Sequence, residues 1–278
     1  MEIQNYFISS NAIVLILILI LVLIGIAIYL LIRVFYKSDV DLKDFTREWR
    51  AILLKDVDYY LHLTAAERIR FERDILIFFD KVRITGVDTK INDKDRLLVA
   101  SSAVIPLFGY PGSSFGNLSE VLIYKDRFNH NYDTQKGENR HILGMVGDGN
   151  MNRHMILSKP ALRNGYDKKH SSHNVGIHEF VHLLDKADGD TDGVPKFVLR
   201  SKEVQPWLDV VHGEIEKILD GKSNINPYGT TNEAEFFSVV SEYFFMQPKM
   251  LKTQHSELYD KLKRIYHQDP ANGLGQLI

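Results

Sequence analysis

One segment near the middle of the chain carries the residues best suited to chemistry. It reads Val175-Gly-Ile-His-Glu-Phe-Val-His-Leu-Leu-Asp185, which contains an H-E-x-x-H pattern. If the segment is helical, His178 and His182 lie four residues apart on one face, where two imidazoles can bind one zinc ion. Glu179 lies beside them and could act as a general base. The flanking residues are apolar, which predicts a buried helix whose polar side chains need partners.

The same segment allows a plainer interpretation. It could be a buried amphipathic helix whose histidines hydrogen-bond to their neighbours, because a bare H-E-x-x-H pattern also arises by chance. A catalytic zinc usually has three protein ligands and one position for water. The zinc hypothesis therefore depends on finding a third ligand elsewhere in the chain.

Composition restricts the kinds of site and partner. The 278 residues include no cysteine, so any metal must rest on His, Asp or Glu, and disulfides and cysteine nucleophiles are excluded. The formal charge is −2, with acidic and basic residues interleaved. This pattern indicates no electrostatic surface for nucleic acid.

An apolar run near the N-terminus predicts a membrane anchor. Residues 12–32 are apolar without a break, and about 20 helical residues cross a hydrocarbon core of about 30 Å. Lys and Arg follow the run and none precedes it. The positive-inside rule then predicts a single-pass protein of the inner (cytoplasmic) membrane, with its catalytic domain facing the cytoplasm. We divide the chain into an anchor with its flank, 1–38, and one domain, 39–278.

The domain is expected to be α+β, mostly helical with a small mixed sheet. Thr64 and Glu67 form a capping-box signature, and no repeat or linker divides residues 40–278. Strands are predicted at 121–124 and 154–158, and a loop or hairpin at 132–150. Helical patterns cover 44–55, 64–81, 97–108, 174–186, 207–219, 233–246 and 258–266.

Three arrangements could supply the third metal ligand. Asp188 lies six residues after His182, but a ligand at that spacing requires a glycine turn midway, and Asp185 occupies that position. Asp185 could itself bind, one helical turn beyond His182. Glu235 and Glu242 lie seven apart in an apolar helix and share a face, so one could bind the metal while the other supports a histidine.

Other polar residues have simpler interpretations. The segment Asp188-Gly-Asp-Thr-Asp-Gly193 imitates the opening of a calcium loop, but Leu199 stands where an EF-hand needs a carboxylate and Pro195 disrupts the loop. A tight turn after the helix is the better interpretation. Surface or packing roles are expected for His141, His154 and His173.

Several motifs carry a family resemblance. Tyr228-Gly-Thr-Thr-Asn-Glu-Ala-Glu-Phe-Phe237 resembles the corresponding segment of the anthrax lethal factor metalloprotease domain. The H-E-x-x-H segment, the Asp-Gly-x-x-Asp-Gly-x-Pro turn ending at Pro195, and Ser241-Glu-Tyr-Phe-Phe245 resemble the Mlc titration factor A family of zinc peptidases. The motifs occur in the right order and separation, and the resemblance covers about residues 45–270.

The resemblance implies a zincin-like fold of the gluzincin type, with one zinc ion per chain. It implies His178, His182 and Glu235 as metal ligands and Glu179 as the base. It also implies that Tyr228, seven residues before the third ligand, assists the transition state.

The chain departs from the family pattern at two places. The run at 12–32 is not part of the soluble family members. Val239 stands where thermolysin-type sites have an Asp four residues after the glutamate ligand. Glu242, Ser238 or Asp185 must therefore supply any supporting contact to the ligands.

The predicted function is a membrane-anchored zinc metallopeptidase, either an amino- or an endopeptidase. A zinc-activated water would attack the peptide bond of a peptide or protein substrate, with Glu179 as general base. The strand at 154–158 could pair with an extended substrate. The alternative is a membrane-tethered protein that sequesters a cytoplasmic regulator, as the family does with the Mlc repressor, and keeps a vestigial site. An intramembrane protease is disfavoured because the run at 12–32 has no His, Asp or Glu.

Overall fold

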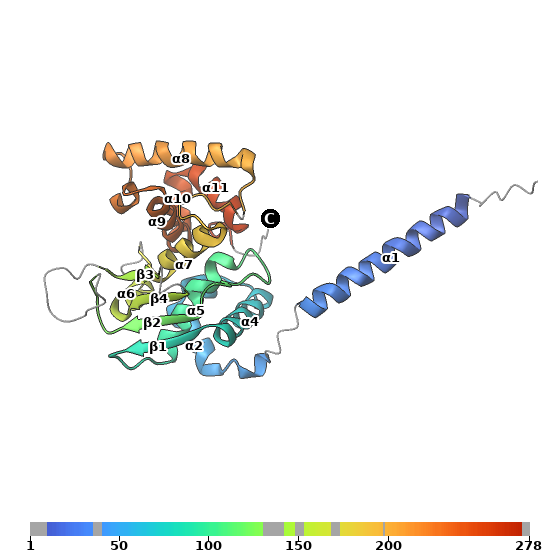
Figure 1. Ribbon diagram of the computed structural model, residues 1–278, viewed down its shortest axis with the longest axis horizontal. Coiled ribbons are helices and arrows are strands. Elements are labelled where there is room, and N and C mark those ends of the chain that lie inside the picture. Colours follow the sequence, from blue (N-terminus) through green and yellow to red (C-terminus); the bar gives the residue numbers. More distant parts are fainter. Residues whose placement is uncertain are drawn as a thin grey trace, which may run out of the picture. The chain divides into compact units, whose positions relative to one another are not determined.

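Two compact units make up the chain, Met1–Asp39 and Val40–Ile278. The computed structural model describes residues 10–35, 41–129, 142–147, 153–167, 173–196 and 198–273. The first unit contains one helix, α1, from Ser10 to Phe35 (Figure 1). The second unit holds the sheet and all the other described helices.

The predicted membrane anchor is corrected by the structure. Among the described residues, no helix combines the length and the apolar character that a membrane crossing requires. The transmembrane helix over 12–32, the membrane as a partner and the inner-membrane location are corrected accordingly.

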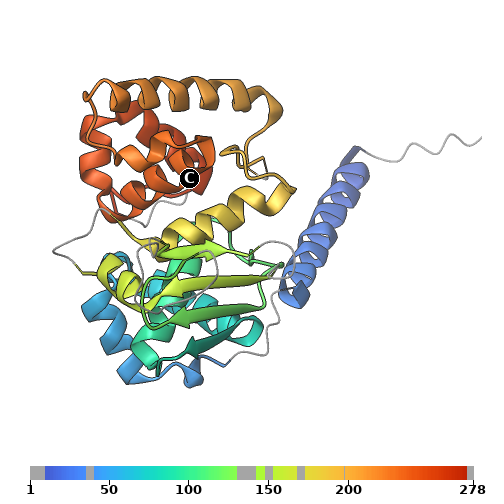
Figure 2. The ribbon, with the colours of Figure 1, turned by 60° about the vertical axis from the view of Figure 1, so that its left-hand side comes forward.

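A small mixed sheet forms one layer of the second unit (Figure 2). Its strands are β1 (Arg83–Val87), β2 (Glu120–Tyr124), β3 (Gly144–Val146) and β4 (His154–Ser158). The order is β1-β2-β4-β3, with β1, β2 and β4 parallel and β3 antiparallel to β4. The predicted strands at 121–124 and 154–158 are therefore present, and β3 falls within the predicted loop or hairpin. The rest of that segment, apart from residues 142–147, lies outside the described residues.

Capping residues set where the helices of the first half begin. The capping box of Thr64 and Glu67 is confirmed, and a second one, formed by Asn92 and Asp95, starts the next long helix earlier than its apolar pattern indicated. These helices are α2 (Arg47–Asp56), α3 (Asp58–Leu61), α4 (Ala65–Lys81), α5 (Asp93–Leu107) and α6 (Lys159–Gly165).

The C-terminal half is helical, and α7 (Val175–Asp185) lies between it and the sheet (Figures 1 and 2). Helix α7 packs against α5, α9 and β3. The remaining helices are α8 (Ser201–Leu219), α9 (Glu233–Met246), α10 (Pro248–Gln254) and α11 (Ser256–Tyr266), with the short 3-10 turns η1 (Leu42–Asp44), η3 (Lys186–Asp188) and η4 (Pro227–Thr230). The structure is mostly helical with a small mixed sheet, as predicted.

Aromatic packing fixes the back of α7. The Phe180 ring lies 5.8 Å from the ring of Phe78 on α4 and 5.0 Å from that of Phe115, measured between centroids. All three side chains belong to the apolar core or pack on it. Edge and tilted contacts of this kind add to the burial of apolar area. The helix that carries the H-E-x-x-H pattern is therefore anchored to the core through Phe180.

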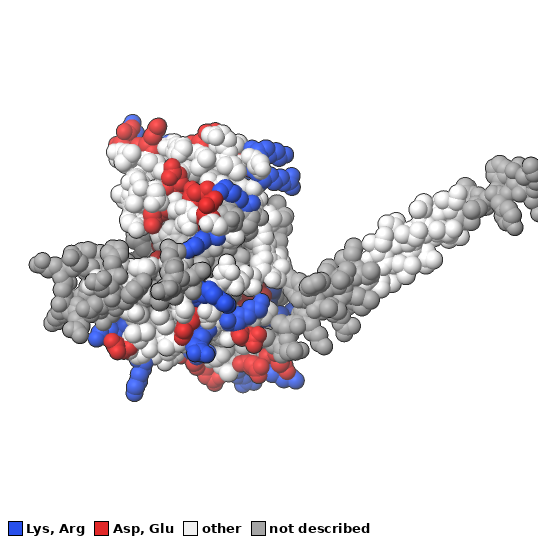
Figure 3. Space-filling model, viewed as in Figure 1, with Lys and Arg blue, Asp and Glu red and all other residues white. Residues whose placement is uncertain are grey.

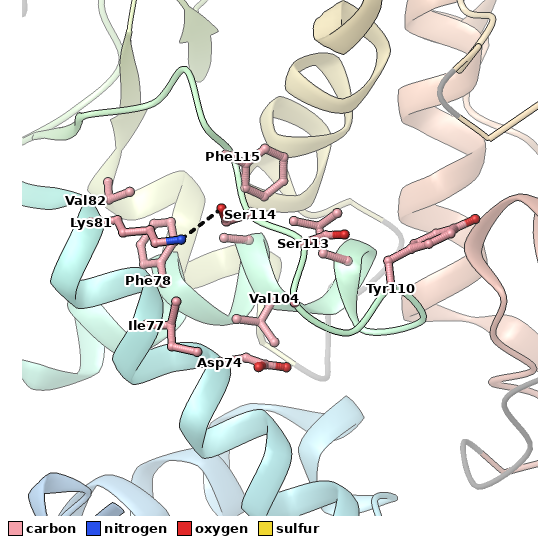
Figure 4. A pocket seen from close by; sticks show the side chains of 13 residues that line it. Asp74, Ile77, Phe78, Lys81, Val82, Val104, Tyr110, Ser113, Ser114 and Phe115 are labelled. Carbon is pink, nitrogen blue, oxygen red and sulfur yellow. Dashed lines mark hydrogen bonds between the residues drawn. The ribbon is translucent and has the colours of Figure 1, made fainter. Parts of the chain in front are cut away.

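A small cavity of about 50 Å³ lies beside Phe115, between α4, α5 and the segment that follows α5 (Figure 4). Its lining is mostly apolar. Lys81 donates a hydrogen bond to the Ser114 hydroxyl across 3.2 Å. Burial raises the pKa of Asp74, on the same cavity, to about 6, although Arg70 and Arg73 oppose the shift.

The surface of the second unit carries charge of both signs. On the face shown in Figure 3, Lys and Arg side chains are interspersed with Asp and Glu side chains.

Candidate metal centre and active site

Helix α7 places two imidazoles side by side. The side chain of Asn174 caps the helix by accepting the N–H of Ile177 at 3.1 Å, which satisfies one of the free donors of the first turn. The four-residue spacing then puts His178 and His182 on one face. Their ring centroids are 4.7 Å apart, and their Nε2 atoms are 3.1 Å apart.

Helix α9 brings a carboxylate to the same point. Asn232 caps this helix by accepting the N–H of Glu235 at 2.8 Å, so that Glu235 sits in the first turn. Its Oε2 atom lies 3.0 Å from Nε2 of His178 and 3.4 Å from Nε2 of His182. Among the described residues, these three form a group whose ligand atoms all lie within 4.8 Å of one another.

The three atoms fit a zinc ion. Zinc binds imidazole nitrogen and carboxylate oxygen at about 2.0–2.2 Å, and tetrahedral geometry then separates neighbouring ligand atoms by about 3.3–3.5 Å. The distances among Nε2 of His178, Nε2 of His182 and Oε2 of Glu235 are 3.0, 3.1 and 3.4 Å, close to that tetrahedral separation. Two histidines and a glutamate are also a ligand set of catalytic zinc sites that leave one position open.

The second nitrogen of each ring also has a partner. Nδ1 of His178 lies 2.7 Å from Oε1 of Glu242, and Nδ1 of His182 lies 3.2 Å from the Ser238 hydroxyl. The other oxygen of Glu242 accepts the backbone N–H of Asn174 at 2.5 Å. Such contacts fix the tautomer of each ring and leave both Nε2 atoms facing the centre.

Asp185, one of the two competing aspartates, does not join this group. Asp185 is buried, and its Oδ2 atom accepts the backbone N–H of Gly193 at 2.8 Å, so it holds the turn that follows α7. The side chain of Asp188 lies outside the described residues. Lys196 pairs with Asp190 at 3.3 Å and with Asp192 at 2.8 Å, which offsets the negative charge of that turn.

The charges of the group are mutually supporting. Burial opposes the charged ring of His178, but hydrogen bonds to Glu235 and Glu242 outweigh it and raise the pKa of His178. Burial likewise opposes the charge of Glu235, yet hydrogen bonds from His178 and His182 hold the pKa of Glu235 below its ordinary value. The contacts therefore favour a charged His178 ring beside an ionised Glu235 carboxylate.

Glu179 is buried beside this group and in contact with β3. Burial raises the pKa of its carboxyl, although the neighbouring histidines oppose the shift. A Cβ atom added at Gly144 would lie 2.6 Å from Cγ and 2.7 Å from Oε1 of Glu179. Only glycine leaves room there, so β3 runs directly against the side chain of Glu179.

Tyr228 lies on η4, and its side chain is partly exposed. Asn226 caps this turn by accepting the N–H of Tyr228 at 3.0 Å. The Tyr228 side chain is 53% exposed, and its ring centroid lies 6.1 Å from that of His178. Burial of part of the ring and the carboxylates of Glu235 and Glu179 raise the pKa of its hydroxyl.

The remaining predictions on histidines and strands have separate outcomes. His173 is exposed, and its ring lies 3.3 Å from the Asn226 amide nitrogen, outside the metal group. His154 begins β4, and His141 lies outside the described residues. The prediction that 154–158 pairs with a substrate is wrong, because β4 is already paired with β2 on one side and β3 on the other.

Comparisons with known proteins identify relatives that cover most of the chain. An uncharacterized protein of Synechocystis sp. is 29% identical over 232 residues, which are 80% of this chain and 84% of that protein. Mlc titration factor A of Klebsiella pneumoniae is 24% identical over 248 residues, which cover 84% of this chain and 91% of that protein. Mlc titration factor A of Pectobacterium atrosepticum is 29% identical over 185 residues, which cover 59% of this chain and 66% of that protein. The predicted resemblance to the Mlc titration factor A family is confirmed.

A family profile gives the same result. The profile described as glucose-regulated metallo-peptidase M90 matches residues 33–267, which include both α7 and α9. This match covers most of the chain. The chain therefore belongs to the family of glucose-regulated metallo-peptidases M90.

Proposed function

We propose that this protein is a zinc-dependent peptidase whose metal is held by His178, His182 and Glu235. The observation that carries the proposal is the convergence of their three ligand atoms, at 3.0–3.4 Å from one another, next to the buried carboxylate of Glu179. A structural metal site would not need that carboxylate. When bound there, zinc lowers the pKa of a water toward about 7 and polarises the scissile carbonyl.

The side chains of the chain would then divide the proton chemistry between them. Glu179 accepts a proton from the attacking water and returns it to the leaving amine, for which its raised pKa suits it. The Tyr228 hydroxyl donates a hydrogen bond to the developing oxyanion. Its hydroxyl must stay protonated to do so, and its raised pKa favours that form.

Strand β3 supports a peptide as the substrate. Leu143 accepts from the N–H of Ser158 at 2.8 Å, and the N–H of Gly147 donates to His154 at 2.9 Å. In an antiparallel pair these bonds alternate, so residues 144 and 146 turn their backbone groups away from β4. Within the described residues that edge of β3 has no second strand. An extended peptide pairing with it would run beside Glu179.

The test compares the full chain with its Glu179→Gln variant. Both proteins are assayed for bound zinc and for cleavage of a mixed library of N-terminally free and blocked peptides. We expect about one zinc per chain in both, and cleavage by the wild type alone, reduced at least 100-fold in the variant. Cleavage of blocked peptides would indicate an endopeptidase. Equal cleavage by both proteins would refute the role of Glu179.

The same assay decides the alternative function. Several relatives are named Mlc titration factor A, a name which says that those proteins titrate Mlc. If both proteins bind zinc and neither cleaves any peptide, the metal centre is structural. Capture of a regulatory protein would then be the better proposal.

A further inference from the structure

A groove lies next to the metal group but takes no part in it. Its volume is about 320 Å³, which is at the lower end for small-ligand sites and enough for one large side chain. The apolar part of its lining is formed by Ile225, Val239 and Tyr243, all of them buried. Its polar part includes the amide side chains of Asn224, Asn226 and Gln247.

Three segments that line the groove adjoin residues of the candidate site. On α9, Val239 lies one helical turn after the ligand Glu235, on the same face. On η4, Asn226 and Pro227 immediately precede Tyr228. Before α7, His173 adjoins the residue whose backbone N–H binds Glu242. The groove is therefore lined by immediate neighbours of Glu235 on α9 and of Tyr228, whose ring lies 6.1 Å from that of His178, although none of the three ligands lines it.

The groove is already formed, because hydrogen bonds hold most of its polar rim. Asn224 donates to the Tyr243 hydroxyl at 2.5 Å and contacts Nε2 of His255 at 2.8 Å. Asn226 is held by the backbone N–H of Tyr228. Gln247 differs from them: its amide makes no side-chain hydrogen bond among the described residues, and the side chain is half-buried.

We propose that this groove is the subsite for a large uncharged side chain next to the scissile bond, and that Gln247 determines its specificity. The inference rests on the proposed peptidase function. No Lys, Arg, Asp or Glu belongs to the described lining, so a charged substrate side chain would lose its water without gaining a partner. An apolar or aromatic side chain would bury its area against the floor, and its polar tip could meet the amide of Gln247.

The test introduces opposite charges at one position of the groove. Gln247→Glu is nearly isosteric with the wild type, and Gln247→Lys reverses the added charge. Gln254→Glu and Gln254→Lys are the matched controls, because Gln254 is exposed at the other end of α10 and does not line the groove. The full chain and all four variants are profiled on a peptide library varied on both sides of the cleaved bond. Zinc content and far-ultraviolet circular dichroism verify folding.

We expect the wild type to prefer Phe, Leu, Met or Tyr at one flanking position. At that position Gln247→Lys should favour acidic residues, and Gln247→Glu basic ones, by roughly two- to fivefold, the scale of a partly exposed ion pair. The Gln254 variants should leave the profile unchanged. If one Gln247 variant fails to fold, the other still decides the direction of the shift.

Two results would overturn the inference, and they are distinguishable. If the wild type cleaves peptides and neither Gln247 variant changes the profile, the subsite is refuted and the peptidase function stands. If the wild type cleaves nothing, the proposed function fails and the subsite fails with it.

Discussion

Glu242 is the residue whose replacement tests the metal centre most sharply. Its two oxygens face two donors: Nδ1 of His178 at 2.7 Å and the backbone N–H of Asn174 at 2.5 Å. In Glu242→Gln the side chain keeps its size but has one oxygen and one NH2 group. Only one of the two donors can then be satisfied, and the other is left facing an N–H.

The structure sets the size of the effect on zinc affinity. A hydrogen bond to a charged group contributes about 1.5–3 kcal/mol, and every 1.4 kcal/mol is tenfold in affinity, so the loss should be about 10- to 100-fold. The same range applies to other residues that orient metal-binding histidines. Ser238→Ala removes the neutral partner of His182, at 3.2 Å, and should cost only about two- to tenfold.

Zinc affinity is measured by competition with a chromophoric chelator, on the full chain at fixed pH and salt. Glu179→Gln serves as the control, because Glu179 is not among the three grouped ligand atoms and its replacement should change affinity little. If Glu242→Gln binds zinc within twofold of the wild type, the carboxylate does not orient His178 and the reasoning is refuted. A loss as large in Ser238→Ala would refute the ranking of the two contacts.

Three further changes have expected outcomes. Tyr228→Phe should lower kcat about 10²- to 10³-fold with zinc affinity unchanged, if the hydroxyl stabilises the oxyanion; an unchanged kcat in a peptide assay would exclude that role. Gly144→Ala places a Cβ atom 2.6 Å from Cγ of Glu179, so kcat should fall at least tenfold while zinc content stays the same, and full activity would show that β3 yields easily. Asp74→Asn should stabilise the fold above pH 6 by about 1–2 kcal/mol. The raised pKa of about 6 means that the folded state binds a proton more tightly than the unfolded chain does. The wild type therefore loses stability as pH rises from about 4 to 6, and the variant does not. Urea unfolding at pH 4 and pH 8 measures this difference, and an equal gain at both values would contradict the assignment.

Helical periodicity allowed much of the fold to be predicted from sequence. Segments with a strong apolar pattern, such as those of α4, α7 and α9, appear close to their predicted bounds. The short elements were missed for a physical reason. Strand β3 is brief, and both β1 and β3 are mostly outside the buried core. Their stability comes from pairing with β2 and β4, which leaves little local pattern.

The membrane anchor shows the limit of composition as a guide. The apolar run at 12–32 satisfied the length that a spanning helix needs, yet no described helix meets the requirement. The prediction took every residue of the run as part of one continuous apolar span. Hydropathy of the sequence alone therefore predicted more than the structure supports.

Spacing predicted half of the candidate site, and long-range contact supplies the other half. Four-residue spacing on α7 is local information, so His178 and His182 could be paired from sequence alone. Glu235 could not be chosen over Asp188 or Asp185 in that way, because only the packing of α9 on α7 brings its carboxylate to 3.0 Å from His178. The family resemblance, and not geometry, made that choice.

Residues that act through backbone groups were beyond the reach of motif reading. Gly144 matters for the side chain it lacks, and Asn174 for a helix cap whose backbone N–H also holds Glu242. An asparagine before an apolar helical pattern is a usable cap signal. That its N–H meets a carboxylate from another helix could not be foreseen from its position in the chain.

Contacts among the buried charged residues of the group compensate one another. The ring of His178 lies between two carboxylates, those of Glu235 and Glu242, and its contacts with them offset part of the cost of burying their charge. His178, His182 and Glu235 would hold a zinc ion at the same point. Glu242 would keep its contacts with His178 and with the first turn of α7 in both states. The geometry of the site is therefore set by the packing of α7 against α9.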